Sequence, residues 1–426
     1  MKRFLLVLAL AAQGFVFAQN ADAIINAKEV ERIERMLASD EMSGRKAGTP
    51  GSDKAAQFIA EEFRKAGLKT SKDSGSYLQS FKMAEPKLVQ LKAVLDNREF
   101  DSKKVLVLTS KPEVTITEKL AYDTATIAAG PSFFMDAFKL YMTPKSYIVF
   151  VDETHAQRFP HLAQFGQHVI ASDRNLVFIL TNTRPKQFTI EAKHDVTDVS
   201  IANVVGILPG KTKPDEYVVF SAHYDHLGIG EPVNGDSIYN GANDDAAGTT
   251  AVIMLAKYFK QLNNNERTLV FAAFTAEELG GFGSQYFSHQ FNPEQVMAMF
   301  NIEMIGTESK WGKNSAYITG YDETDMGKIL QENLKGSVFT FHPDPYPGQQ
   351  LFYRSDNATL ARLGVPAHTI STSKMDSEKY YHTVDDEIET LDLQNMAAII
   401  KAIAESSRTI VDGKATPTRV NAQNLR

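Results

Sequence analysis

The sequence predicts an α/β fold in which helices sandwich a mixed, largely parallel central sheet, with an inserted β-rich subdomain. From residue 201 onward, apolar strand-like runs such as "EYVVFSAHYDH", "TLVFAAFTA" and "AMFNIEMIG" alternate with helical runs. Such alternation is typical of a largely parallel sheet that is covered on both faces. Between residues 87 and 200, short β-type runs and polar turns replace this alternation, which predicts the inserted subdomain.

The first twenty residues, "MKRFLLVLALAAQGFVFAQN", have the pattern of a secretory signal peptide. A basic start is followed by an apolar stretch and then by small residues before position 19. An N-terminal anchor helix is the alternative, but the apolar stretch is short for a membrane span. We therefore expect the protein to be exported, either to the periplasm or out of the cell.

These patterns divide the chain into five segments. We expect a signal peptide at 1–18 and the N-terminal part of the main domain at 19–86. The inserted subdomain is expected at 87–200, the main α/β core at 201–412 and a loose tail at 413–426.

Helices are expected between the strands of the core. Their ranges are 245–262, 284–290, 324–334, 356–363 and 391–411. Nearer the N-terminus, "DKAAQFIAEEFRKAGL" places its apolar residues near one face of a helix, and Gly67 fits the end of that helix.

The composition limits the class of protein. Hydrophobic residues make up 43% and charged residues 23% of the 426, which is typical of a soluble domain with a sizeable core. A net charge of -7 argues against nucleic acid as a partner. No segment after the signal resembles a membrane span, so we expect no stable membrane insertion. The chain has no cysteine, so any metal site must use His, Asp and Glu.

Several strand-like runs end in polar residues that packing does not require. "SAHYDHLG" carries His223 and Asp225, which face the same side of a strand. "NGANDDAAGTT" carries Asp244 between Asn243 and Asp245 at the expected start of a helix. A helix cap is the alternative there, but a cap needs one such residue and not three.

Three further positions add acids and a histidine. Glu277 and Glu278 are adjacent at a strand end, so one can bind a metal while the other takes a proton from water. Glu303, in "FNIEMIG", has apolar neighbours, and a buried glutamate needs a partner. His382 stands in a loop before the last helix, where a structural imidazole is the alternative.

Together these residues form a donor set that suits zinc or another divalent ion. Two histidines, one aspartate and two glutamates can serve two metals if one carboxylate bridges them. The glutamate that is left over can then act as a base.

At this point the chain resembles the M28 family of zinc-dependent exopeptidases, which includes aminopeptidases and glutamate carboxypeptidase. The motifs "NVVGILPG", "SAHYDHLG", "GANDDAAG", "TAEELGGFGS", "NIEMIG", "RSDNATLARLGVPA" and "YYHTVDDE" occur in the family's order. The resemblance also covers "LASDEMSGRKAGTPGSDKAAQFIAEEFRKAGL" near the N-terminus. Relatives often carry a protease-associated domain at the place of residues 87–200. The implied fold is that of the zinc exopeptidases, with residues 201–412 as the catalytic core.

The resemblance also implies a role for each residue. The metal ligands would be His223, Asp244, Glu278, Glu303 and His382. The general base would be Glu277. Three further residues would assist, namely Asp225, Tyr381 and Asp386. Asp225 would orient the ring of His223, Tyr381 would hydrogen-bond the reaction intermediate, and Asp386 would support the loop of His382.

Two Zn²⁺ ions per chain would be bridged by Asp244. Many members of the family have aspartate at the place of Glu303, so the longer glutamate alters the geometry expected at the first metal. The expected substrates are peptides, and the expected reaction is release of N-terminal residues. The sequence makes no prediction about the oligomeric state.

Three alternatives stay open. A glutamate-carboxypeptidase-like hydrolase would want a basic pocket, for which Arg354 is a lone candidate. A glutaminyl cyclase would use one metal, whereas the ligand set here is sufficient for two. A non-catalytic binding ectodomain would lack ligands, and none is missing from the motifs.

Overall fold

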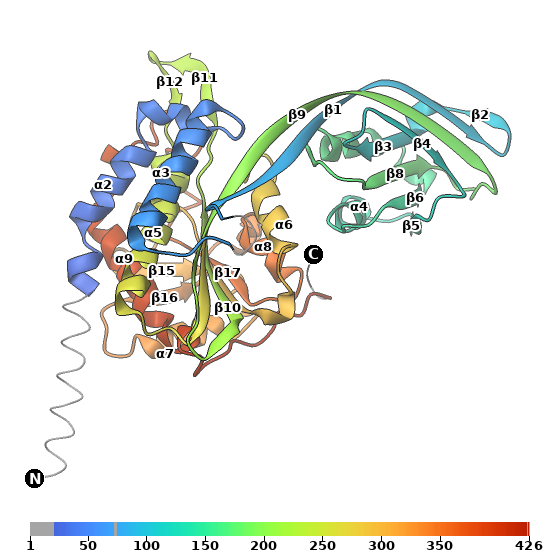
Figure 1. Ribbon diagram of the computed structural model, residues 1–426. Helices are drawn as coiled ribbons and strands as arrows, with labels where there is room; N and C mark the ends of the chain where they lie inside the picture. Colours follow the sequence, from blue (N-terminus) through green and yellow to red (C-terminus); the bar gives the residue numbers. More distant parts are fainter. Residues whose placement is uncertain (1–20, 72–74, 424, 426) are drawn as a thin grey trace, which may run out of the picture. The chain divides into compact units, whose positions relative to one another are not determined.

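The chain folds into two compact units, seen in the computed structural model of Figure 1. The structure describes residues 21–71, 75–423 and 425. The first unit comprises the described residues up to 80 and those from 202 to 425, and the second comprises residues 81–201. The second unit overlaps the subdomain expected at residues 87–200 and is seven residues longer. The expected signal peptide lies outside the described residues.

The first unit begins with helices, as expected. Helix α2 spans Ala27–Leu37, the short η1 spans Asp40–Arg45, and α3 spans Pro50–Ala66. The end of α3 is set by Gly67, which has a left-handed φ of 76°. A residue with a Cβ adopts that φ only at a cost, so the glycine fits the helix end as predicted.

The central sheet of the first unit has the strand order β16-β15-β17-β14-β10-β13-β9. In that order the strands span Thr340–Pro343, Ser315–Ile318, Ala367–Ser371, Val296–Ile302, Lys213–His223, Arg267–Phe274 and Phe188–Leu208. Four of the six neighbouring pairs are parallel, while β15–β17 and β13–β9 are antiparallel. The sheet is therefore mixed and largely parallel, which confirms the predicted fold class. A separate hairpin pairs β11 (Gly228–Val233) with β12 (Asp236–Tyr239).

The helices of the core begin within two residues of their expected starts. Helices α5, α6, α7, α8, α9 and α10 span Ala247–Leu262, Phe282–Ser288, Met326–Asn333, Asn357–Ala361, Leu393–Ser406 and Arg408–Val411. The last two replace the single helix expected at 391–411. A short π-helix, η5, spans Ala242–Ala246 and leads into α5.

Helices cover both faces of this sheet (Figure 1). Phe220 of β10 packs into a core shared with α2, α3, α5, α7 and α9. Its neighbour Val219 points to the other face and packs with residues of α6 and α8. Such alternation along one strand is the pattern of a sheet buried on both sides.

The second unit is β-rich, with one α-helix of 9 residues and three 3-10 helices among its residues 81–201. Its four-stranded sheet has the order β3-β8-β6-β5. Its strands are β1 (Leu78–Leu95), β2 (Arg98–Phe100), β3 (Val105–Thr109), β4 (Glu113–Thr117), β5 (Asp123–Ile127), β6 (Tyr147–Val151), β7 (Val169–Ile170) and β8 (Asn175–Leu180). The helix α4 spans Phe133–Tyr141. The chain enters this unit within β1 and leaves it within β9.

The described part of the C-terminal segment is not loose, which corrects the expectation for residues 413–426. Val420 and Leu425 are buried in the core beside α6 and α8. Arg419 donates hydrogen bonds to the main-chain carbonyls of Val296 and Pro293. The polar composition of the segment concealed these anchors, because two apolar side chains are enough to hold a short tail. None of the helices in the described ranges has the length and apolar character needed to cross a membrane.

Candidate metal centre

The candidate site lies at the carboxyl ends of neighbouring parallel strands. Strand β10 ends at His223, β13 is followed by Glu277 and Glu278, and β14 is followed directly by Glu303. Ligand sites of open α/β sheets form at this edge. A pocket here is lined by Asp244, Glu277, Glu278, Glu303, Met304, Tyr317, Thr319, Leu351, Arg354, Ser355, Thr369, Ser371, Ser373, Met375 and Tyr381.

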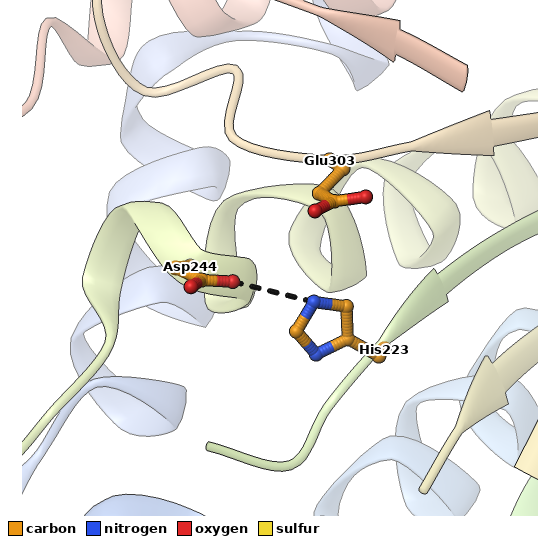
Figure 2. Close-up of side chains that lie close together, drawn as sticks. All are labelled: His223, Asp244 and Glu303. Atoms are coloured by element: carbon orange, nitrogen blue, oxygen red, sulfur yellow. Dashed lines mark ion pairs between the residues drawn. The ribbon is translucent and has the colours of Figure 1, made fainter. Parts of the chain in front are cut away.

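One group of possible ligands consists of His223, Asp244 and Glu303 (Figure 2). One ligand atom from each lies within 4.8 Å of the others. The Nε2 atom of His223 is 3.3 Å from Oδ1 of Asp244. Figure 2 shows the three side chains converging from the end of β10, from η5 before α5 and from the end of β14.

A second group of possible ligands consists of His226, Asp244 and Glu278, so it shares Asp244, and His382 lies beside it. Oδ2 of Asp244 is 3.3 Å from Nε2 of His382, and that same nitrogen is 3.2 Å from Oε2 of Glu278. Asp244 thus directs one carboxylate oxygen to each of two histidines. This is the arrangement that a bridging ligand requires.

These spacings fit a bound zinc ion. With bonds of about 2.0–2.1 Å, two ligand atoms of a tetrahedral zinc site lie about 3.3 Å apart. Among the ligands predicted from the sequence, three buried atoms make no hydrogen bond to any described residue, namely Nε2 of His223, Nε2 of His382 and Oε2 of Glu303. Because a polar atom that is buried without a partner is costly, these atoms fit a site whose partner is a cation.

The pKa values of the buried carboxyl groups also fit a site that binds a cation. Burial raises the pKa of Asp225 and that of Glu303 to about 7, and it raises the pKa of Asp356 to about 6. For Glu278, burial is outweighed by hydrogen bonds from His226 and His382, which lower its pKa to about 2. Among the described residues, none of these carboxylates forms an ion pair with lysine or arginine.

Glu277 belongs to neither ligand group in the described structure. It lines the pocket, partly exposed, while its main-chain N–H donates to Oδ1 of Asp225 at 3.1 Å. Burial, with the nearby charges of Glu303 and Asp356, raises its pKa well above the usual range. Glu277 is thus positioned to exchange a proton with a molecule in the pocket.

Asp225 does not hold the ring of His223 in the way that the resemblance implies. Nδ1 of His223 is 3.1 Å from the main-chain carbonyl of Asp225, whereas the carboxylate Oδ1 is 3.8 Å away. The carboxylate instead accepts from the N–H of Glu277. The main chain therefore orients the ring, and the Asp225 side chain connects β10 to the loop that follows β13.

Two other aspartates hold the backbone around the ligands. Asp386 accepts from the main-chain N–H groups of Asn243 and Asp244, at 2.9 and 3.0 Å. It therefore supports the loop of Asp244 directly, rather than acting only on that of His382. Asp245 accepts from the N–H groups of His223, Gly248 and Met304, at 3.3, 3.0 and 3.0 Å. These hydrogen bonds connect Asp245 to both β10 and the segment after β14.

Tyr381 lines the pocket, and its ring stacks on that of His382, with 3.9 Å between ring centroids. The positions of Tyr381 and His382 thus depend on each other.

Sequence reasoning missed three buried residues near the centre. They are His226, Asp356 and Arg45. Arg45 donates to the main-chain carbonyls of Tyr224, Asn240 and Gly241, which flank the ligand loops. A second histidine in "HYDH" was a signal for His226, but no signal distinguished Arg45 from a surface arginine.

The fold is similar to that of solved aminopeptidases. An aminopeptidase from Aneurinibacillus sp. strain AM-1 superposes with a TM-score of 0.55 at 16% identity, over 96% of this chain and 98% of that one. A zinc aminopeptidase from Bacillus subtilis also gives a TM-score of 0.55, at 18% identity over 92% and 97%. The chain therefore has the same mixed α/β fold as these aminopeptidases.

Sequence comparison leads to the family. Residues 203–407, a little under half of the chain, match the model of Peptidase family M28. It is 30% identical over 207 residues to leucine aminopeptidase 1 of Pyrenophora tritici-repentis, covering 46% of this chain and 52% of the relative. It is 24% identical over 242 residues to aminopeptidase YwaD of Bacillus subtilis, covering 53% and 50%. The chain spans about half the length of the curated relatives it matches.

Proposed function

We propose that the protein is an exported dizinc aminopeptidase that releases N-terminal residues from peptides. The observation that carries the proposal is the position of Asp244, whose two oxygens each lie 3.3 Å from Nε2 of a different histidine. His223 and Glu303 would hold the first ion with Asp244, and Glu278 and His382 would hold the second. Relatives named as leucine aminopeptidases and a neighbour named as a zinc aminopeptidase support zinc and the reaction.

When bound, the zinc ions would polarise the substrate carbonyl and lower the pKa of a bound water. Glu277 takes a proton from the attacking water, because its carboxylate lines the pocket and its backbone is held by Asp225. Glu277 then donates this proton to the nitrogen of the leaving amine as the C–N bond breaks. Tyr381 supplies a hydroxyl in the same pocket for the oxygen that becomes negative.

Export is the part of the proposal that rests on sequence alone. The basic start, the apolar stretch and the small residues before position 19 support it. Expressing the full chain and determining the N-terminal residue of the recovered protein tests export. A start near residue 19 in the periplasm or medium supports the proposal, and an intact Met1 in the cytoplasm contradicts it.

A carboxypeptidase is the second candidate, because Arg354 lines the pocket. Of the described residues in that lining, Arg354 alone is cationic, and its Nη1 donates to Oε1 of Gln349 at 3.3 Å. A cation there could bind a substrate carboxylate. Against this reading, a single partly engaged arginine faces four carboxylates in the same pocket.

The deciding experiment compares three kinds of substrate, each with and without a chelator. They are peptides with a free N-terminus, the same peptides with an acetylated N-terminus, and peptides that begin with glutamine. We expect release of the N-terminal residue only where the N-terminus is free, without cyclisation of glutamine, and we expect this activity to be abolished by the chelator and restored by zinc. Cleavage of acetylated peptides from the C-terminus would favour the carboxypeptidase, and cyclisation of N-terminal glutamine would favour a glutaminyl cyclase.

A further inference from the structure

His226 is a buried histidine that belongs to the second group of possible ligands but has no role in the mechanism above. It follows β10 by three residues, and its side chain is fully enclosed. Nδ1 of its ring is 2.8 Å from Oε1 of Glu278, which is a hydrogen-bond distance. The carboxylate can only accept, so Nδ1 must carry the proton.

The hydrogen bond to Oε1 leaves the other oxygen of Glu278 free for the metal. Oε2 of Glu278 is the atom that lies 3.2 Å from Nε2 of His382. The two oxygens of one carboxylate are thus divided between two histidines. One oxygen is held by His226, and the other faces the position shared by His382 and Asp244.

The ring of His226 is also fixed from the side. A side chain at Gly241 would come within 2.5 Å of Cδ2 and 2.6 Å of Cγ of that ring. The ring of His382 lies on another side, edge-on, with 5.6 Å between centroids. The close approach of the Gly241 backbone therefore sets the direction in which Nδ1 points.

A purely structural histidine in this chain has a different pattern of bonds. His368, also buried, uses both ring nitrogens, at 2.8 Å from the carbonyl of Thr319 and 2.8 Å from Oγ1 of Thr324. In His226, by contrast, Nε2 is buried and makes no hydrogen bond to any described residue. The fold gains one bond from His226, and that bond goes to a metal-ligand candidate.

The distances also argue against His226 as a ligand itself. Nδ1 of His226 is 3.9 Å from Oδ2 of Asp244, whereas Nε2 of His382 is 3.3 Å from the same atom. Its 2.8 Å contact with Glu278 is shorter than the separation of about 3.3 Å expected between two zinc ligands. We propose that His226 is a positioning residue for the second metal site, holding Oε1 of Glu278 so that Oε2 stays directed toward Asp244 and His382.

This inference rests on the proposed dizinc site, and zinc affinity tests it without any assay of activity. The two dissociation constants of the metal-free protein are measured by competition with a chromophoric chelator. The variants are His226→Asn, His226→Gln and His226→Phe, with His368→Asn as the matched control for loss of a buried ring. Asparagine keeps an N–H donor at the position of Nδ1, whereas glutamine places its amide farther out and phenylalanine has none.

We expect His226→Gln and His226→Phe to weaken the second zinc by about 10–100-fold, as for other groups that orient a ligand. His226→Asn should stay within about threefold of the wild type, and His368→Asn should leave both constants unchanged while lowering the melting temperature. If His226→Phe fails to fold, the comparison of the asparagine and glutamine variants decides.

Two results would overturn the inference. Wild-type affinity in His226→Gln or His226→Phe would show that the hydrogen bond does not matter. An equal loss in His226→Asn and His226→Phe would show that the ring itself binds the metal. A wild-type protein that binds fewer than two zinc ions would instead overturn the proposed function, and the inference with it.

Discussion

The first unit buries carboxylates in two regions that solve the problem of charge in opposite ways. On the helical face, Glu62 of α3 is 1% exposed, and cations surround it. Its oxygens lie 2.7 Å from Arg32, 2.6 Å from Lys257 and 3.2 Å from Lys65. Although burial opposes it, these partners lower the pKa of Glu62 to about 2. The charge of Glu62 is satisfied by the protein itself.

At the sheet edge, the carboxylates have histidines and other acids as neighbours. Burial raises the pKa of Asp225, of Glu303 and of Asp386 to about 7 each. Among the described residues, no lysine or arginine forms an ion pair with any of these three. The difference teaches that burial of an acid is not by itself a sign of function. What marks a metal site is a cluster of buried acids whose cations are not supplied by the chain.

The strongest way to sharpen this comparison is to change Glu277 to glutamine. The amide keeps the size of the side chain but cannot take a proton, so turnover should fall by about 10²–10⁴-fold. Both metals should stay bound, because Glu277 is in neither ligand group. Kinetics and metal analysis of the same sample check both points. Loss of a metal, or turnover near that of the wild type, would mean that Glu277 and Glu278 have exchanged roles.

Replacing Asp244 with alanine removes the residue shared by both ligand groups. We expect the affinity for both metals to fall together, each by more than about 100-fold, since a direct ligand matters more than a group that orients one. Zinc content after dialysis against a buffered zinc solution measures this. Retention of one tightly bound zinc would show that Asp244 serves a single metal.

The next residue in the chain, Asp245, provides a control for Asp244→Ala. Asp245→Ala should lower the melting temperature clearly, because its carboxylate accepts from three main-chain N–H groups. A helix-start role alone would predict a mild effect, and the buried hydrogen bonds argue for a larger one. Full loss of zinc in a stably folded Asp245→Ala protein would move the bridge by one residue.

Glu303 allows one metal to be disturbed selectively. Glu303→Ala should weaken the first zinc by about 10–100-fold and affect the second much less, because Glu278 and His382 are unchanged. Glu303→Asp should keep measurable activity, since a carboxylate is still present. Competition titrations of the two variants under identical zinc buffering measure this. Two wild-type affinities in Glu303→Ala would make Glu303 a structural acid.

Replacing Glu62 should give the smallest effect, and it should change the melting temperature without changing zinc binding. Glu62→Gln should lower the melting temperature by a few degrees at pH 7, since Arg32 and Lys65 are partly exposed and screened by solvent. The pKa of Glu62 is depressed in the folded state, so its stabilisation is present above the ordinary glutamate value of about 4.3. That stabilisation is lost as the pH falls toward 2.

The difference in melting temperature between the wild type and Glu62→Gln should therefore narrow from pH 7 to pH 3, and the two proteins should bind zinc equally at pH 7. A gap in melting temperature that widens toward acid pH would contradict the assigned pairing.

The sequence was enough to predict the fold class, the helices of the core and the residues that gather at the sheet edge. These features depend on periodicity and on motifs that stand at strand ends, as for His223 and Glu303. The roles of Asp225 and Asp245 could not be read in the same way. Their partners are main-chain N–H groups, which carry no signal in the sequence. His226 and Arg45 depend likewise on close approaches of distant backbone segments.

The C-terminal segment shows a second limit. Its composition is polar, and only the structure reveals that Arg419 and Val420 attach it to the core. Sparse anchors of this kind do not form a periodic pattern, so a tail held by them looks the same in sequence as one that is free.

The central claim is that the acids and histidines at the sheet edge form a site for two metals. The most direct measurement is to titrate the metal-free protein with zinc and to count the bound ions per chain by isothermal calorimetry and by elemental analysis. Glu62→Gln is titrated beside it as a control. The account predicts two zinc ions in both proteins and fewer than one in Asp244→Ala. One zinc in the wild type, or equal binding by Asp244→Ala, would contradict it.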